Sequence, residues 1–212
     1  PDTTRLLDSL SKFYKIGKEF ISVGLGAEGV IKDIFLTIFL KKKKVKILTT
    51  SPNFFMYKYY SKLFDFNFHE IQILNKKKIL LNFDRLEKEI KAKKINFLIL
   101  VNPSSPIEKK WDNKDLLKII KLCNRKKILL LLDQVYEKDL KFSNLKLVKN
   151  FKNIIILGSF SKIFGLPGLR LGYCFSNKQT IKEINTCRLA IELPAETIEY
   201  SKFLLDNWKV QL

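Results

Sequence analysis

Apolar residues occur along the chain in two alternating patterns. Short, nearly continuous apolar runs predict seven β-strands, at residues 19–23, 45–49, 68–74, 96–101, 127–133, 153–157 and 170–175. Apolar residues three or four positions apart predict six helices, at residues 28–40, 55–64, 83–93, 112–124, 178–188 and 195–208. Buried strands separated by helices indicate a mostly parallel sheet that is covered on both faces. The pattern therefore predicts an α/β fold, a three-layer sandwich.

Ligands of such sheets bind beyond the carboxyl ends of the strands, so the polar residues at those ends are of interest. Five consecutive apolar residues of the strand at 127–133 lead to Asp133, and Tyr136 follows three residues later. A carboxylate at the tip of a buried strand is costly unless it has a cationic partner. Asp133 and Tyr136 are therefore candidate site residues, although an Asp that caps the next turn would give the same local pattern.

The strand at 153–157 leads into a turn that carries Ser159, Ser161 and Lys162. Lys162 stands alone between apolar segments, and Arg170, one of only five arginines, follows eight residues later. Hydroxyl groups and an arginine suit a phosphate. A lysine near a buried carboxylate and a phosphate site suits a Schiff base with pyridoxal phosphate. Taken alone, the segment would also fit an ordinary surface lysine.

A third polar segment, Asn102-Pro103-Ser104-Ser105-Pro106, follows the strand at 96–101, and its two prolines make a rigid loop. Seven of the eight glycines lie within residues 24–29 and 158–172, beside strand ends. Glycine is used where the backbone turns tightly or approaches a ligand. Ordinary turns would explain any one of these segments by itself, so their meaning depends on their combination.

The formal charge of +19 first suggests a nucleic-acid partner. The chain contains 35 lysines against 5 arginines, however, whereas nucleic-acid readers rely on arginine for bidentate contacts. Most lysine runs follow a helical pattern or precede an apolar strand, at residues 41–44, 76–78, 93–94, 109–110 and 126–127. We interpret them as a solvated surface, with binding of a polyanion as the alternative.

The cysteines and the single histidine indicate a reducing compartment, and they give no sign of a metal site. Cys123, Cys174 and Cys187 are odd in number and lack metal-like spacing, so a cytoplasmic protein without disulfides is expected. The single histidine, His69, has no nearby cysteine, and no metal is expected. No secretory signal is visible, and the uncharged run at 34–40 is too short to span a bilayer.

In their order and spacing, these segments resemble the motifs of fold-type I pyridoxal-phosphate aminotransferases of class I/II. The family's N-P-N-N-P-T-G loop is similar to residues 102–106, and its D-E-A-Y to Asp133-Gln134-Val135-Tyr136. Its S-x-S-K-x-F-G-x-x-G-x-R-x-G-Y motif is matched by residues 159–173. The Y-P-D and G-N-G-S-D-E-A-I segments of the histidinol-phosphate aminotransferase branch resemble Pro1-Asp2 and residues 24–31. The resemblance implies the large domain of a pyridoxal-phosphate-dependent transferase.

The resemblance also implies roles for matching positions. Lys162 would form the Schiff base with pyridoxal 5'-phosphate and then move the proton between the substrate and the cofactor. Asp133 would pair with the protonated ring nitrogen, and Tyr136 would donate a hydrogen bond to the ring oxygen. Phe54 matches the aromatic residue that stacks on the ring, without the hydroxyl of the usual tyrosine.

The phosphate would be held by Ser159, Ser161 and Arg170. The backbone N–H groups of Ala27 and Glu28, at the start of the helix at 28–40, would complete this cradle through the helix dipole.

One polar position departs from the family. The asparagine that normally contacts the ring oxygen is replaced by Ser105, which is shorter and lacks the amide donor. Water could bridge the gap. Asn102 matches an earlier asparagine of the loop and is expected to be structural.

Length is the other departure, because family members run to well over three hundred residues. Residues 1–212 are expected to form the large cofactor domain, incomplete at its N-terminus and without the small C-terminal domain. The resemblance implies a homodimer and an aminotransferase that uses a small-molecule amino donor, an amino acid or amino-alcohol phosphate, and a 2-oxo acid. A pyridoxal-phosphate decarboxylase of the threonine-phosphate type and an inactive basic binding protein remain as alternatives.

Overall fold

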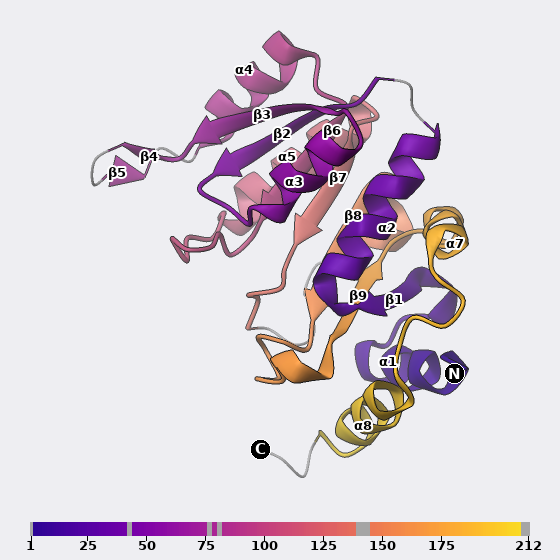
Figure 1. Cartoon of the computed structure of the whole chain (residues 1–212). Coiled ribbons are helices and arrows are strands. Elements are labelled where there is room, and N and C mark those ends of the chain that lie inside the picture. The colour runs from indigo at the N-terminus through magenta and orange to yellow at the C-terminus, as the bar shows by residue number, and fades with distance from the viewer. Residues whose placement is uncertain (1, 42–43, 76–77, 80–81, 139–144, 209–212) are drawn as a thin grey trace.

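The computed structural model describes residues 2–41, 44–75, 78–79, 82–138 and 145–208, and its centre is a seven-stranded sheet (Figure 1). The strand order is β1-β9-β8-β7-β6-β2-β3. The strands are β1 (Ile21–Leu25), β2 (Lys46–Ser51), β3 (Asn67–Gln72), β6 (Phe97–Val101), β7 (Leu129–Asp133), β8 (Ile154–Ser159) and β9 (Leu171–Phe175). β3, β2, β6, β7 and β8 are parallel, which confirms the predicted mostly parallel sheet.

Helices cover both faces of the sheet, so the three-layer sandwich is confirmed. One face packs against α2 (Gly26–Lys41), α3 (Met56–Leu63) and α7 (Lys178–Cys187). The other packs against α1 (Thr4–Tyr14), α4 (Phe83–Lys93), α5 (Asn113–Arg125), α6 (Leu147–Asn150) and α8 (Ala195–Asp206). Neighbouring residues of a strand serve opposite faces: Ile99 packs with the first set and Leu98 with the second.

The predicted elements are present with shifts of a few residues at their ends. Asp112 caps α5, as expected from its place before the helical pattern, because its side chain accepts a hydrogen bond from the Asp115 N–H at 2.7 Å. Among the described residues, six short or terminal elements were not predicted: α1, α6, β4 (Leu74–Asn75), β5 (Lys78–Ile79) and the 3-10 helices η1 (Lys18–Phe20) and η2 (Pro167–Leu169). Lysines 42–43 and 76–77 of the predicted surface runs lie outside the described residues.

β9 is antiparallel to both of its neighbours, β8 and β1. Residues 160–170 join β8 to β9 with only the short 3-10 helix η2 (Pro167–Leu169), whereas a parallel crossover needs a dozen or more residues. β1 consequently runs in the same direction as β8. The ends of β1, β2, β6, β7 and β8 and the start of β9 therefore meet at one edge of the sheet.

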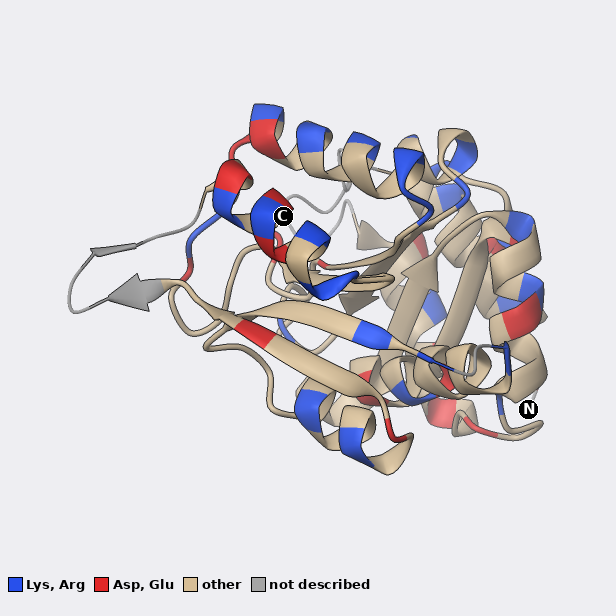
Figure 2. Cartoon of the chain, turned by 90° about the horizontal axis from the view of Figure 1, so that it is seen from above, with Lys and Arg blue, Asp and Glu red and all other residues tan. Residues whose placement is uncertain are grey.

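The positive charge is distributed over helices on both sides of the sheet (Figure 2). Several of these lysines form surface ion pairs with acidic neighbours, such as Lys91 with Glu87 and Lys118 with Asp115. This distribution supports the interpretation of the lysines as a solvated surface. Within the described part of the chain, no helix is long and apolar enough to cross a membrane.

Candidate active site

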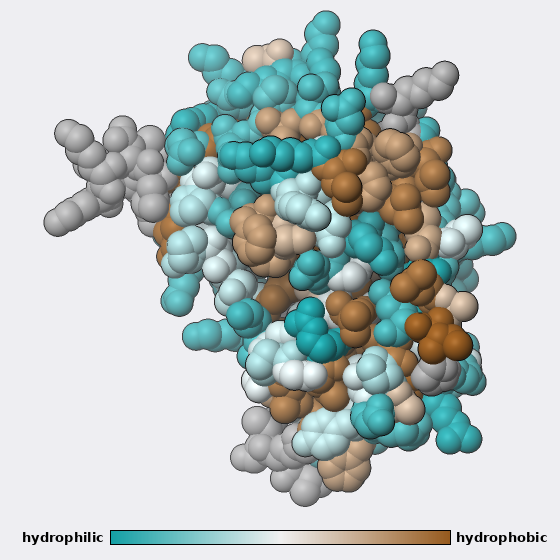
Figure 3. Space-filling view, viewed as in Figure 1, coloured by the Kyte–Doolittle hydropathy of each residue, from teal (hydrophilic) through white to brown (hydrophobic). Residues whose placement is uncertain are grey.

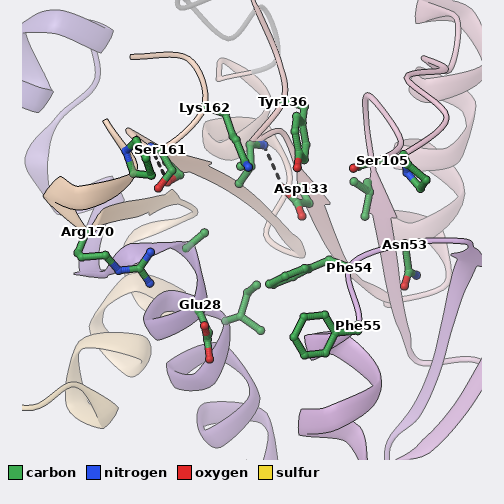
Figure 4. A pocket seen from close by; sticks show the side chains of 17 residues that line it. Glu28, Asn53, Phe54, Phe55, Ser105, Asp133, Tyr136, Ser161, Lys162 and Arg170 are labelled. Carbon is green, nitrogen blue, oxygen red and sulfur yellow. Dashed lines mark hydrogen bonds between the residues drawn. The ribbon is translucent and has the colours of Figure 1, made fainter. Parts of the chain in front are cut away.

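A cavity of about 410 Å³ lies at the edge where these strand ends meet (Figure 4). Every site residue predicted from the sequence lines it: Ala27, Glu28, Phe54, Ser105, Asp133, Tyr136, Ser159, Ser161, Lys162 and Arg170. Arg170 and Ser105 lie at opposite ends in Figure 4, with Asp133 and Phe54 between them. The fold thus gathers the predicted residues from six separate segments into one site.

Asp133 ends β7 and is only 5% exposed. Its Oδ2 accepts a hydrogen bond from the Tyr57 hydroxyl at 2.6 Å, and its Oδ1 accepts one from the Val135 N–H at 3.0 Å. Burial raises the pKa of Asp133, and these two hydrogen bonds oppose that rise. Among the described residues, no lysine or arginine forms an ion pair with it. The carboxylate therefore suits a cationic group that enters the cavity.

Lys162 and Tyr136 lie next to each other at the cavity (Figure 4). The Lys162 Nζ atom is 5.2 Å from the centre of the Tyr136 ring, within the range of a cation–π contact. Both side chains are exposed, and they come from the turns that follow β8 and β7. An accessible amine is thereby held beside the buried carboxylate of Asp133.

The other end of the cavity is suited to an anion. Arg170 has a left-handed backbone (φ 52°), and its carbonyl accepts a hydrogen bond from the Gly26 N–H at the start of α2. The Ser159 Oγ accepts a hydrogen bond from the Ser161 N–H at 3.1 Å, which shapes the turn that carries both hydroxyls. The guanidinium, the hydroxyls and the first N–H groups of α2 converge there, and such groups bind phosphate.

Two glycines allow this convergence. Gly26 has φ +69°, which favours glycine, and a Cβ on it would lie 2.7 Å from the Arg170 guanidinium. A Cβ on Gly172 would overlap the backbone of Gly26 and Ala27. β9 and the turn before α2 can therefore approach each other only because both positions lack a side chain.

Two residues of the loop after β6, Asn102 and Ser105, have different places, as expected. Asn102 is buried, and its Oδ1 accepts a hydrogen bond from the Trp111 N–H at 2.9 Å. Its own N–H donates to the Asp133 carbonyl at 2.8 Å. Asn102 thus fixes the loop, whereas Ser105 is half-buried and lines the cavity.

Sequence reasoning missed Tyr57, which is fully buried and donates to Asp133. Burial and the neighbouring Asp133 raise the pKa of Tyr57 well above its usual value, so its hydroxyl keeps the proton it donates. In the sequence, Tyr57 is one of several aromatic residues of the predicted helix at 55–64. A tyrosine on the buried face of a helix needs a polar partner, and that requirement was the available signal. Asn53 and Phe55 also line the cavity and were not predicted.

The family model for aminotransferase class I and II matches residues 3–194. The chain is similar to the histidinol-phosphate aminotransferase of Caldanaerobacter subterraneus, with 29% identity over 185 residues, covering 87% of this chain and 51% of that protein. It is 33% identical over 180 residues to the chloroplastic histidinol-phosphate aminotransferase 1 of Arabidopsis thaliana, covering 82% of this chain and 40% of that protein. The chain spans about half the length of the curated relatives it matches.

Solved structures share its fold. Histidinol-phosphate aminotransferase from Sinorhizobium meliloti, in complex with pyridoxal-5'-phosphate, has a TM-score of 0.84 at 17% identity, covering 98% of this chain and 56% of that one. L-Threonine-O-3-phosphate decarboxylase from Porphyromonas gingivalis has a TM-score of 0.82 at 22% identity, covering 98% of this chain and 59% of that one. At these identities, the two likenesses bear on the fold alone.

Proposed function

Because this chain belongs to the family of class I and II aminotransferases, we propose that it is the cofactor-binding part of a pyridoxal-phosphate-dependent aminotransferase. Its reaction moves an amino group between an amino acid or amino-alcohol phosphate and a 2-oxo acid. The relatives named histidinol-phosphate aminotransferases support an amino-alcohol phosphate as the donor. The observation that carries the proposal is the single cavity that unites Lys162, Asp133 and Arg170.

The residues present fit this cofactor. Asp133 is a buried carboxylate without a cationic partner among the described residues, and a protonated pyridine nitrogen is such a partner. Arg170, Ser159, Ser161 and the start of α2 form an anion site at the other end, which fits the phosphate. The exposed amine of Lys162 lies in the same cavity and can bond to an aldehyde.

When bound, pyridoxal phosphate supplies an electron sink that stabilises negative charge at the α-carbon of the substrate. Asp133 holds the proton on the ring nitrogen, and Tyr57 and the Val135 N–H keep Asp133 in place. Lys162 would bind the cofactor and move a proton to and from the α-carbon. Tyr136 would donate a hydrogen bond to the ring oxygen.

The remaining predicted residues bind and orient. Phe54 would cover one face of the ring and exclude water from it. Ser105 would reach the ring oxygen through a water molecule, since its side chain is shorter than the usual asparagine. Ala27 and Glu28 contribute backbone N–H groups to the phosphate site.

The proposal includes domain organisation, assembly and compartment. Residues 1–212 form the large cofactor domain, and the further length of the curated relatives corresponds to segments outside it. Two copies pair, which is supported by the exposed apolar side chains of Leu25, Leu189 and Ile191 on segments beside the cavity. The cytoplasm is the compartment, which is supported by the unpaired thiols of Cys123, Cys174 and Cys187.

The first test measures attachment of the cofactor to Lys162. The protein is incubated with substoichiometric pyridoxal phosphate, reduced with borohydride, digested and mapped by mass spectrometry. Lys162 is expected to carry the cofactor, and the visible absorption band of the mixture is expected to disappear in Lys162→Ala. The matched control is Lys121→Ala on the surface of α5, which should retain the band.

A band that survives in Lys162→Ala, or label spread over many lysines, would contradict the proposal for this chain. If Lys162 is labelled, donors are compared next. Histidinol phosphate with 2-oxoglutarate should yield glutamate. Release of carbon dioxide from threonine phosphate would instead support the decarboxylase alternative.

A further inference from the structure

Glu192 lies in the connection between α7 and α8 and has no role in the proposed site. Its side chain is only 4% exposed. One carboxylate oxygen, Oε1, accepts a hydrogen bond from the Leu25 N–H at 3.3 Å. The other, Oε2, accepts one from the Arg188 Nε at 3.3 Å, and the Arg188 side chain is itself 13% exposed. A buried carboxylate on irregular backbone is thus tied to the last residue of β1.

The Glu192 carboxylate also lies against two glycines of the turn from β1 into α2, Gly24 at the end of the strand and Gly29 in the first turn of the helix. A Cβ on Gly29 would lie 3.1 Å from Oε1, and one on Gly24 would lie 3.5 Å from it. Between these glycines are Ala27 and Glu28, whose side chains line the cavity. On the opposite side, the turn is held by the hydrogen bond from the Gly26 N–H to the Arg170 carbonyl. The turn is therefore held from two sides, by Arg170 and by Glu192.

The charges around Glu192 explain why Arg188 accompanies it. Asp33 of α2 is 1% exposed, and the Nζ atom of the adjacent Lys32 lies 3.3 Å from its Oδ1. Burial, followed by the charge of Glu192, raises the pKa of Asp33 to about 6, while Lys32 and Arg188 oppose that rise. Two buried carboxylates that repel each other need nearby cations, and Lys32 pairs with Asp33 whereas Arg188 pairs with Glu192.

We propose that Glu192, held by Arg188, is a positioning residue that fixes the turn at Gly24–Gly29 so that the first N–H groups of α2 bind the cofactor phosphate. This inference rests on the proposed function and deepens it. A residue that fixes only the phosphate end should change the affinity contributed by the phosphate and leave that of the ring unchanged. A residue with a merely structural role should weaken both contributions together.

The test compares two ligands, 4-deoxypyridoxine 5'-phosphate and 4-deoxypyridoxine. Neither carries an aldehyde, so neither reacts with the 35 lysines. Their dissociation constants are measured by calorimetry for the wild type, Glu192→Ala and Glu192→Gln. Glu196→Ala is the control, because Glu196 lies nearby in the first turn of α8 and is exposed.

Glu192→Ala is expected to bind the phosphorylated ligand about tenfold more weakly, the effect of losing a hydrogen bond to a charged group. Its affinity for the unphosphorylated ligand should stay unchanged. Glu192→Gln should recover most of the loss, because its amide oxygen can still accept from Leu25. Glu196→Ala should behave as the wild type with both ligands.

Equal weakening of both ligands, or no weakening of either, would overturn the positioning role. If Glu192→Ala does not fold, Glu192→Gln decides, with an expected selective loss of about threefold because it lacks the charge that Arg188 pairs with. Failure of the wild type to bind the phosphorylated ligand at all would instead overturn the proposed function, and this inference with it.

Discussion

For individual site residues, the sequence indicates the chemistry of the side chain but not its hydrogen-bond partner. An apolar run that ends in Asp133 is enough to suggest a functional carboxylate, because burial of an unpaired charge needs a reason. Its partner Tyr57 lies 76 positions away along the chain, and only the packing of α3 on the sheet brings the two together. The place of Asp133 in the cavity was therefore predictable from the sequence, whereas the hydrogen bond from Tyr57 that opposes the rise of its pKa was not.

Asp33 gives a pH-dependent prediction at the same scale. Its pKa of about 6 in the folded protein exceeds the ordinary value of 3.8, so the folded state retains the proton between these values. Ionisation of Asp33 hence costs stability as the pH rises from about 4 to 6, and the full cost persists above pH 6. Asp33→Asn should raise the free energy of unfolding by at most about 3 kcal/mol at pH 7.5.

The measurement is urea unfolding of the wild type and Asp33→Asn at pH 4.5 and pH 7.5. The advantage of the variant should shrink strongly at the lower pH. An advantage of the same size at both values would show that the charge of Asp33 is not its source. Glu196→Gln, which changes an exposed carboxylate, serves as the control.

Helices and strands were predicted where the apolar spacing is regular. The N-terminal helix α1 was not predicted. α1 buries Leu6, Leu10 and Tyr14, but it lies before the first predicted strand and the alternation of strands and helices did not call for it. The antiparallel direction of β9 depends on the length of the connection from β8. Apolar periodicity carries no information about strand direction, so the fold class followed from the sequence and this detail did not.

The junction of β9 with the turn before α2 gives the prediction at this scale. Gly172→Ala should lower the free energy of unfolding by at least about 2 kcal/mol, because the new methyl group meets the backbone of Gly26 and Ala27. Gly168→Ala is the matched control, since a Cβ there has no neighbour within 4 Å among the described atoms. Urea unfolding compares the two variants, and equal stability would contradict the proposed close packing.

The whole molecule exposes apolar side chains among its many charges, as the face in Figure 3 shows. Leu25, Leu189 and Ile191 are 40%, 63% and 76% exposed. Leu25 is joined to the segment that carries the other two by the hydrogen bond from its N–H to Glu192. Exposed apolar groups of this kind are typical of protein interfaces, which supports the proposed pairing of two copies.

Ile191→Lys should therefore shift the chain from dimer to monomer, because a charge would be buried at the contact. Light scattering after gel filtration measures the mass of each species. Phe203→Lys is the control, since Phe203 is 57% exposed on α8, away from these three residues in the sequence. A wild type that is monomeric at high concentration would contradict the proposed pairing.

The pairing of β1 with β9 also constrains the order in which the chain can fold during synthesis. Residues 21–25 find their strand partners at 171–175, so β1 stays unpaired until β9 has left the ribosome. The same late event closes the anion site, because its first N–H groups and Arg170 come from the two ends of that pairing. The proposed cofactor site would thus form only after β9 has been synthesised, and chaperones that shield unpaired strands would meet β1 before that.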